Sequence, residues 1–222
     1  MRPYLLPLLS LFEQHANPMQ AAPMKKYMRD QFEYLGIKTP ERRELQKQFY
    51  AEHGLPPVAE LDSIVRELWA LPQREFQYTA IGLIGRLVEQ IPSDFIKTIE
   101  YLIVAKSWWD TVDGLAADIV AAHFRNFPKV REKTLAKWRK SDNFWLRRTC
   151  ILFQLNYKEE TDFDLLCDII RENLGSEEFF INKAIGWALR QYARTDPQAV
   201  KKFVKATPLD PLSRREAMKH LE

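Results

Sequence analysis

The amino-acid sequence predicts an all-α fold, and three observations lead to that prediction. Helix start signals recur along the whole chain, and the alternating apolar and polar runs that strands require are absent. Glycine is scarce, with 7 residues among 222, where average usage gives roughly 15. So few glycines disfavour folds that depend on tight turns, and no GxGxxG or GxxxxGK phosphate-binding loop is present.

The first helices follow from local signals. Residues 4–12 are predicted as a simple helix rather than a signal peptide, because two prolines and an early Glu13 interrupt the pattern. Thr39 and Pro40 predict the next start, with threonine as the N-cap and proline at the first helical position. Gly54 predicts the end of that helix.

The remaining helices are evenly spaced, and their spacing indicates a repeat. Start signals follow one another 33 to 36 residues apart, at Pro56, Pro92, Pro128, Thr161 and Asp196. A second helix in each unit begins with aromatic residues, at Glu75-Phe76, Trp108-Trp109, Phe144-Trp145 and Phe179-Phe180. A two-helix unit of about 35 residues is typical of an α-solenoid. We therefore predict a HEAT-like α-solenoid of stacked antiparallel helix pairs, forming a single domain over residues 1–222, with the second helices lining a concave basic face.

Composition excludes several classes of function. The formal net charge is +3 and the isoelectric point about 8.8, which suits an anionic partner without requiring one. Two cysteines cannot form a disulfide framework, and the four histidines show no metal-binding pattern. No apolar run reaches the roughly 20 residues of a membrane span. We expect a cytoplasmic, monomeric protein without metal or cofactor.

A basic block lies on adjacent predicted helices, over residues 125–148. It contains nine lysines and arginines, against only two acidic residues: Arg125, Lys129, Arg131, Lys133, Lys137, Arg139, Lys140, Arg147 and Arg148, with Glu132 and Asp142. Two interpretations remain open for this block. It is either an ordinary solvated helix face or a phosphate-binding surface.

Trp187 is predicted to lie on a basic helix face rather than in the core. At 100° per residue its near neighbours on that face are Lys183, Arg190, Gln191 and Arg194, and the apolar residues of this helix lie on the other side. A tryptophan among cations is suited to stacking against nucleic acid. We therefore expect Lys183, Arg190 and Arg194 to contact DNA.

Asp113 and Arg148 are both charged residues on apolar helix faces. Asp113 shares a face with Trp109, four residues earlier, and Arg148 belongs to the corresponding helix of the next unit. A carboxylate in apolar surroundings needs a partner or lines a cleft. The pair is therefore either a structural ion pair between repeats or a cleft carboxylate that an arginine orients.

Several segments together resemble the AlkD family of bacterial DNA alkylation-repair glycosylases. They are Met24-Lys25-Lys26-Tyr27-Met28, Leu35-Gly36-Ile37, Arg74-Glu75-Phe76-Gln77-Tyr78, Ser107-Trp108-Trp109-Asp110-Thr111-Val112-Asp113, Trp145-Leu146-Arg147-Arg148 and the run from Ile181 to Tyr192. The resemblance spans residue 20 to the end of the chain. It implies a HEAT-like solenoid that grips duplex DNA and excises 3-methyladenine and 7-methylguanine in base excision repair.

The resemblance also implies roles for individual residues. The family's catalytic aspartate falls on Asp113, its cleft tryptophans on Trp109 and Trp187, its cleft arginine on Arg148, and a DNA-contacting position on Tyr27. Because no lysine is marked as a nucleophile, we expect a glycosylase without lyase activity. Two alternatives stay open, a non-catalytic binder of damaged or unusual DNA and a protein-interaction scaffold. We also expect Arg148 and the neighbouring Arg147 to be DNA-binding residues, with Arg148 either holding a backbone phosphate or orienting Asp113.

Overall fold

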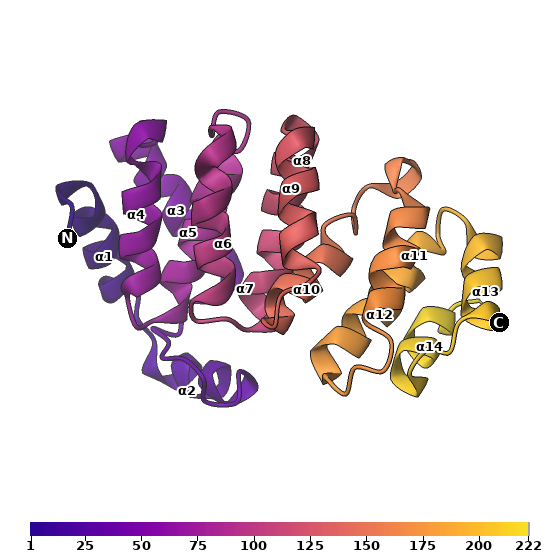
Figure 1. Ribbon diagram of the computed structural model, residues 1–222. Helices are drawn as coiled ribbons and strands as arrows, with labels where there is room; N and C mark the ends of the chain where they lie inside the picture. The colour runs from indigo at the N-terminus through magenta and orange to yellow at the C-terminus, as the bar shows by residue number, and fades with distance from the viewer. Residues whose placement is uncertain (222) are drawn as a thin grey trace. The chain divides into compact units, whose positions relative to one another are not determined.

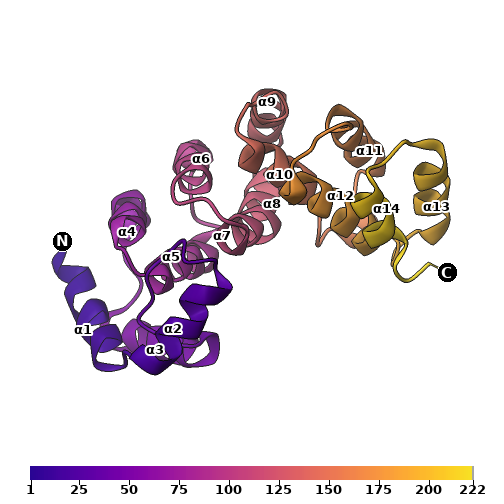
Figure 2. The same ribbon diagram turned by 90° about the horizontal axis from the view of Figure 1, so that it is seen from below.

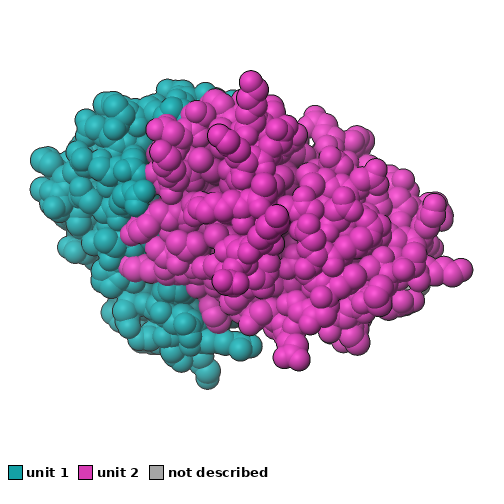
Figure 3. All heavy atoms as spheres, in the orientation of Figure 1, with its two compact units in different colours: residues 1–92 teal, residues 93–222 magenta. Residues whose placement is uncertain are grey.

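The computed structural model describes residues 1–221, and no β-strand occurs among them. Within that range Glu33 and Gln73 form an isolated parallel β-bridge. The prediction of an all-α, solenoid-type fold is therefore confirmed. The chain divides into two compact units, Met1–Pro92 and Ser93–Glu222 (Figure 3). Whether they act as a single domain stays a prediction.

Unit 1 contains the first five α-helices. After a 3₁₀ turn at Pro3–Leu5 these are α1 (Leu6–Gln14), α2 (Pro18–Tyr27), α3 (Thr39–His53), α4 (Val58–Ala70) and α5 (Arg74–Leu87) (Figure 1). α4 and α5 form an antiparallel hairpin across a three-residue connection. In α4 the side chains of Leu61, Ile64, Val65 and Leu68, at helical spacing, are fully buried. Burying a side chain of this size stabilises the fold by roughly 1.5–3 kcal/mol.

A buried carboxylate in unit 1 holds the segment between α2 and α3. The Glu75 side chain is 0% exposed and accepts hydrogen bonds from the backbone N–H groups of Leu35 (3.1 Å), Gly36 (2.9 Å) and Ile37 (3.2 Å). Gly36 has a φ of +90°, and a Cβ atom there would lie 2.0 Å from the carbonyl oxygen of Asn17. Only glycine fits this position. The polar start of α5 therefore secures the chain that carries α2.

Unit 2 consists of helix pairs in two layers (Figure 2). The first layer holds α6 (Ile96–Val104, after a 3₁₀ turn at Ser93–Phe95), α9 (Pro128–Trp138), α11 (Phe163–Glu172, after a 3₁₀ turn at Lys158–Glu160) and α13 (Pro197–Ala206). The second holds α7 (Trp109–Gly114), a π-helical turn (Leu115–Val120), α8 (Ala121–Asn126), α10 (Phe144–Leu152), α12 (Phe179–Tyr192) and α14 (Pro211–Met218). Residues 109–126 thus run as one helix with a π turn at its centre.

The predicted helix starts agree with the structure to within one or two residues, except at Pro92, which precedes a 3₁₀ turn so that α6 begins at Ile96. α9 begins at Pro128, and α13 begins at Pro197 with Asp196 as its N-cap, as the repeat predicts. One cap assignment is wrong, because Thr39 is the first residue of α3 and the N-cap is Lys38, which has no side-chain oxygen to offer. The end of α3 at Gly54, with a φ of +72°, is as expected. No helix within residues 1–221 is long and apolar enough to cross a membrane.

Candidate active site

The side chains of Asp113 and Arg148 form a two-point ion pair inside unit 2. Arg148 Nε donates to Asp113 Oδ1 at 2.8 Å and Nη2 donates to Oδ2 at 2.9 Å. The arginine side chain is 3% exposed and the aspartate side chain 16%. The expectation that these residues meet is confirmed, and the parallel fork holds the carboxylate in one orientation.

Arg148 makes a third contact, with the next helix pair. Its Nη1 donates to the backbone carbonyl oxygen of Phe180, in the first turn of α12. One guanidinium on α10 thereby joins α7 through Asp113 and α12 through Phe180. The side chain of Arg148 is fixed from both neighbours, and the carboxylate of Asp113 is fixed with it.

Burial raises the pKa of Asp113, and the Arg148 guanidinium opposes that rise. The carboxylate has lost most of its water but keeps a small exposed surface. A partly dehydrated anion interacts more strongly with a positive charge than one in bulk water. The geometry therefore suits stabilisation of a cation that forms at the open side of Asp113.

The helix that carries Asp113 changes from α-helical to π-helical geometry shortly after this residue. The π turn at Leu115–Val120 begins two residues after the carboxylate. π turns are rare and often mark functional sites. No spacing or composition in this segment had indicated the turn.

An aromatic cluster packs behind the ion pair. Trp108 lies 5.1 Å from Phe180 and 6.1 Å from Trp145, measured between ring centroids, and Trp145 lies 4.9 Å from Phe180. The Arg148 guanidinium carbon is 5.9 Å from the Phe180 ring. These rings lie at the starts of the second helices of three successive repeats. The aromatic pairs that indicate the repeat in the sequence therefore also mark this cluster.

The two predicted cleft tryptophans are both partly exposed. Trp109 is the first residue of α7, one turn before Asp113, and Trp187 lies in the middle of α12. The neighbours of Trp187 along α12, Gly186 and Ala188, are buried. Trp187 therefore lies at the border of the core rather than inside it.

Lys183 and Arg190, which lie beside Trp187 on α12, are both held in ion pairs. Lys183 Nζ lies 2.7 Å from Glu216 Oε1, and Arg190 Nη1 pairs with Glu216 Oε2. Glu216 belongs to α14, which packs so closely on α12 that a Cβ atom at Gly186 would meet Glu216 Cβ at 2.5 Å. Sequence reasoning missed Glu216, because nothing in its own segment shows that α14 returns to α12.

This ion-pair cluster predicts a pH-dependent contribution to stability. The hydrogen bond from Lys183, with that from Arg190, lowers the pKa of Glu216 from 4.5 to about 2. A lowered carboxyl pKa stabilises the fold above pH 4.5, and the contribution is lost as the pH falls towards 2. We expect Glu216→Gln to lower the free energy of unfolding at pH 7 by about 1–3 kcal/mol, with the difference shrinking below pH 4.5.

Urea unfolding at pH 7 and pH 3 measures this difference. Glu44→Gln is the matched control, because Glu44 pairs with Lys47 where both side chains are exposed, and exposed pairs contribute little. An equal effect of the two substitutions would contradict the special role of Glu216.

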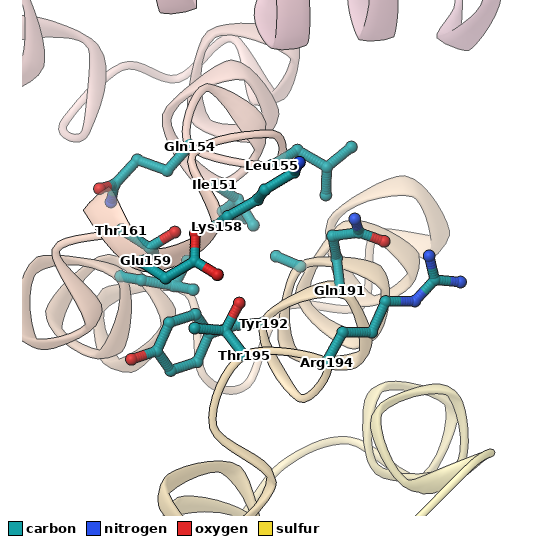
Figure 4. Close-up of a pocket in the computed structure, with 12 residues that line it drawn as sticks. Ile151, Gln154, Leu155, Lys158, Glu159, Thr161, Gln191, Tyr192, Arg194 and Thr195 are labelled. Carbon is teal, nitrogen blue, oxygen red and sulfur yellow. The ribbon is translucent and has the colours of Figure 1, made fainter.

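The remaining predicted contact residues lie in different surroundings. Arg194 is exposed and lines a pocket of about 200 Å³ at the end of α12, on the side opposite Gln154 (Figure 4). The Arg147 guanidinium donates to the carbonyl oxygens of Ser141 and Asp142 and to Asn173 Oδ1, so its hydrogen bonds hold a loop. Tyr27, in unit 1, is 71% exposed at the end of α2.

Much of the basic block is paired with acidic residues from neighbouring helices. Three ion pairs join residues about one repeat apart: Arg125 with Glu160 at 2.8 Å, Lys137 with Glu100 at 2.6 Å, and Arg139 with Glu172 at 2.8 Å. These contacts favour the interpretation as an ordinary helix surface for those three cations, whereas Arg147 holds a loop and Arg148 is buried against Asp113.

No metal site is formed within the described part of the chain: residues 1–221 contain no group of three or more His, Cys, Asp or Glu side chains that could hold an ion.

Comparisons with known proteins give the family. The chain matches the family described as DNA alkylation repair enzyme over residues 8–221. A solved structure described as a predicted DNA alkylation repair enzyme from Enterococcus faecalis is 36% identical, with a TM-score of 0.86, and the match covers 92% of this chain and 96% of that one. A search of curated proteins gave no match. Because the family match extends over nearly the whole sequence, the chain belongs to the family of DNA alkylation repair enzymes.

Proposed function

We propose that this protein is a monofunctional DNA glycosylase that hydrolyses the N-glycosidic bond of N3- and N7-alkylated purines in duplex DNA. The observation that carries the proposal is the carboxylate of Asp113, held by two hydrogen bonds from Arg148, dehydrated, and still open on one side. Membership of a DNA alkylation repair family supports DNA as the partner.

The substrate class explains why a single carboxylate suffices. A purine alkylated at N3 or N7 carries a positive charge, so it leaves as a neutral base without protonation by a general acid. When the C1′–N bond breaks, the electron pair stays on the base nitrogen and positive charge develops on the deoxyribose. The Asp113 carboxylate stabilises that charge and orients the attacking water, whose oxygen bonds to C1′ and whose proton leaves through the carboxylate.

The other cleft residues support this step. Trp109 and Trp187 offer π faces to the cationic sugar and base, worth roughly 0.5–2 kcal/mol each. Arg148 acts as a positioning residue, since its three hydrogen bonds go to Asp113 and the Phe180 carbonyl and its side chain is 3% exposed. The reaction needs neither a metal nor an organic cofactor, because the leaving group is already cationic.

Release of 7-methylguanine from duplex DNA tests the proposal. We expect a duplex with one 7-methylguanine to lose that base faster in the presence of the protein, while the abasic strand stays intact until heated in alkali. An undamaged duplex serves as the control. Release at the spontaneous rate would overturn the proposal and leave a DNA binder without catalysis.

A further inference from the structure

Helices α3 and α5 of unit 1 face each other through three successive polar contacts. The Arg42 guanidinium of α3 lies 5.0 Å from the Tyr78 ring of α5, and the Arg86 guanidinium of α5 lies 5.0 Å from the Tyr50 ring of α3. Between them Gln46 faces Gly82. The three contacts are four residues apart on each helix, about 6 Å of rise. We call this row the α3–α5 seam: Arg42, Gln46, Tyr50, Tyr78, Gly82 and Arg86.

The seam is rich in hydrogen-bond donors and poor in acceptors. Arg42 carries five guanidinium N–H donors but is only 8% exposed. Its hydrogen bond goes to Gln46 Oε1, at a long distance of 3.4 Å. Gln46 Nε2 and Tyr50 Oη are buried without a hydrogen-bond partner. Buried donors of this kind are costly and are normally satisfied.

No carboxylate within residues 1–221 forms an ion pair with Arg42 or Arg86. Glu75 acts on Arg42 only at longer range, and its oxygens already accept three backbone N–H groups. Burial lowers the pKa of Arg42 to about 10, which still leaves it charged at neutral pH. The seam therefore holds a buried cation that lacks a counterion.

The seam is open at its centre. Gly82 is exposed, and the nearest atom to the place of its missing Cβ is Gln46 Nε2 at 3.6 Å. Arg86 is also exposed, whereas Arg42 and Gln46 lie underneath. An anion that settles over Gly82 lies between the two guanidinium groups, and it reaches the covered amide of Gln46 once that side chain turns towards the exposed glycine.

We propose that the α3–α5 seam is a phosphate-binding site and that its ligand is a backbone phosphate of DNA. The partner rests on the proposed function, whereas the preference for an oxyanion rests on the seam alone. Phosphate oxygens accept hydrogen bonds from arginine and amide donors. The exposed glycine lets the nucleic-acid backbone approach closely, and the seam then binds duplex DNA independently of sequence.

Gln46→Glu tests the site, because a binding role and a merely structural role predict opposite results. The new carboxylate gives Arg42 a counterion, so the variant stays folded with an unchanged or higher Tm. We expect its affinity for undamaged duplex DNA to fall about tenfold. The slope of log affinity against log salt becomes shallower by at least 0.9, the share of one lost phosphate contact.

Two further variants complete the DNA experiment. Gln48→Glu makes the same charge change at an exposed position of α3, and we expect DNA affinity within twofold of the parent. Arg86→Gln removes the exposed guanidinium, and the salt slope again loses about 0.9. Parental DNA affinity and salt slope in Gln46→Glu would overturn the assignment of DNA as the ligand.

Inorganic phosphate distinguishes the source of the anion. At constant ionic strength we expect phosphate to raise the Tm of the parent above that in chloride, and to leave the Tm of Gln46→Glu unchanged. If phosphate acts this way but the DNA affinity of Gln46→Glu is parental, the ligand is a free oxyanion and the DNA assignment fails.

The assays also separate this site from the proposed function. Base release with parental DNA affinity in Gln46→Glu overturns the DNA assignment of the seam alone. Weakened DNA binding in Gln46→Glu without base release by the parent overturns the glycosylase activity alone.

Discussion

Replacing Asp113 by asparagine is expected to lower the rate constant of 7-methylguanine release at least 100-fold. Asparagine keeps the size of the side chain and one oxygen for Arg148, but it removes the negative charge that faces the deoxyribose cation. Loss of one preorganised electrostatic contact to a transition state costs about 2.7–4 kcal/mol, or 10²–10³ in rate. Single-turnover release with saturating protein measures this loss without interference from DNA affinity.

Stability must be measured alongside, because the same change leaves Arg148 buried without a counterion. Breaking a buried ion pair from one side costs about 3–5 kcal/mol. The assay is therefore run below the Tm of the variant, with far-UV circular dichroism to confirm folding. Asp118→Asn is the control, since Asp118 is an exposed carboxylate on the same continuous helix. A folded Asp113→Asn protein with parental release would show that the carboxylate is structural.

The helix pairs and the central ion pair could be predicted from the sequence because their signals are local or repeated. Proline and aspartate mark helix starts within a few residues, and the length of the repeat predicts where the second helices begin. Asp113 and Arg148 were detectable because each is a charge on an apolar face, at corresponding places in successive units. Two opposite charges on apolar helix faces, one repeat apart, are expected to form an ion pair with each other.

The contacts that were missed lack any such signal. Phe180 holds Arg148 through its backbone carbonyl, and that oxygen is the same for every residue type. Glu216 reaches Lys183 and Arg190 because α14 packs on α12, which depends on the close approach at Gly186. Helical spacing correctly placed Trp187 beside basic residues, but it could not show that two of them are already paired.

The second large effect is expected in unit 1, at Glu75. Replacing it by glutamine should lower the free energy of unfolding by about 2–4 kcal/mol, because three backbone N–H groups, two of them in buried hydrogen bonds, lose a carboxylate acceptor and meet an amide donor instead. Glu33→Gln removes an exposed carboxylate paired with Lys25 and is the control, with an expected change below 0.5 kcal/mol. Guanidinium chloride unfolding of both variants gives the two values.

The position of the amides that exchange faster shows whether Glu75 acts on one segment or whether the variant loses packing generally. If Glu75 secures the segment between α2 and α3, deuterium uptake in the Glu75→Gln variant rises first at the amides of Leu35, Gly36 and Ile37, which the carboxylate now protects. Peptides of unit 2, around Asp113, keep the uptake of the parent, because their hydrogen bonds do not involve Glu75. Uniformly faster exchange along the chain would contradict a local anchor. Unchanged exchange at residues 35–37 would show that the three N–H groups find other acceptors, because a buried amide without one exchanges quickly.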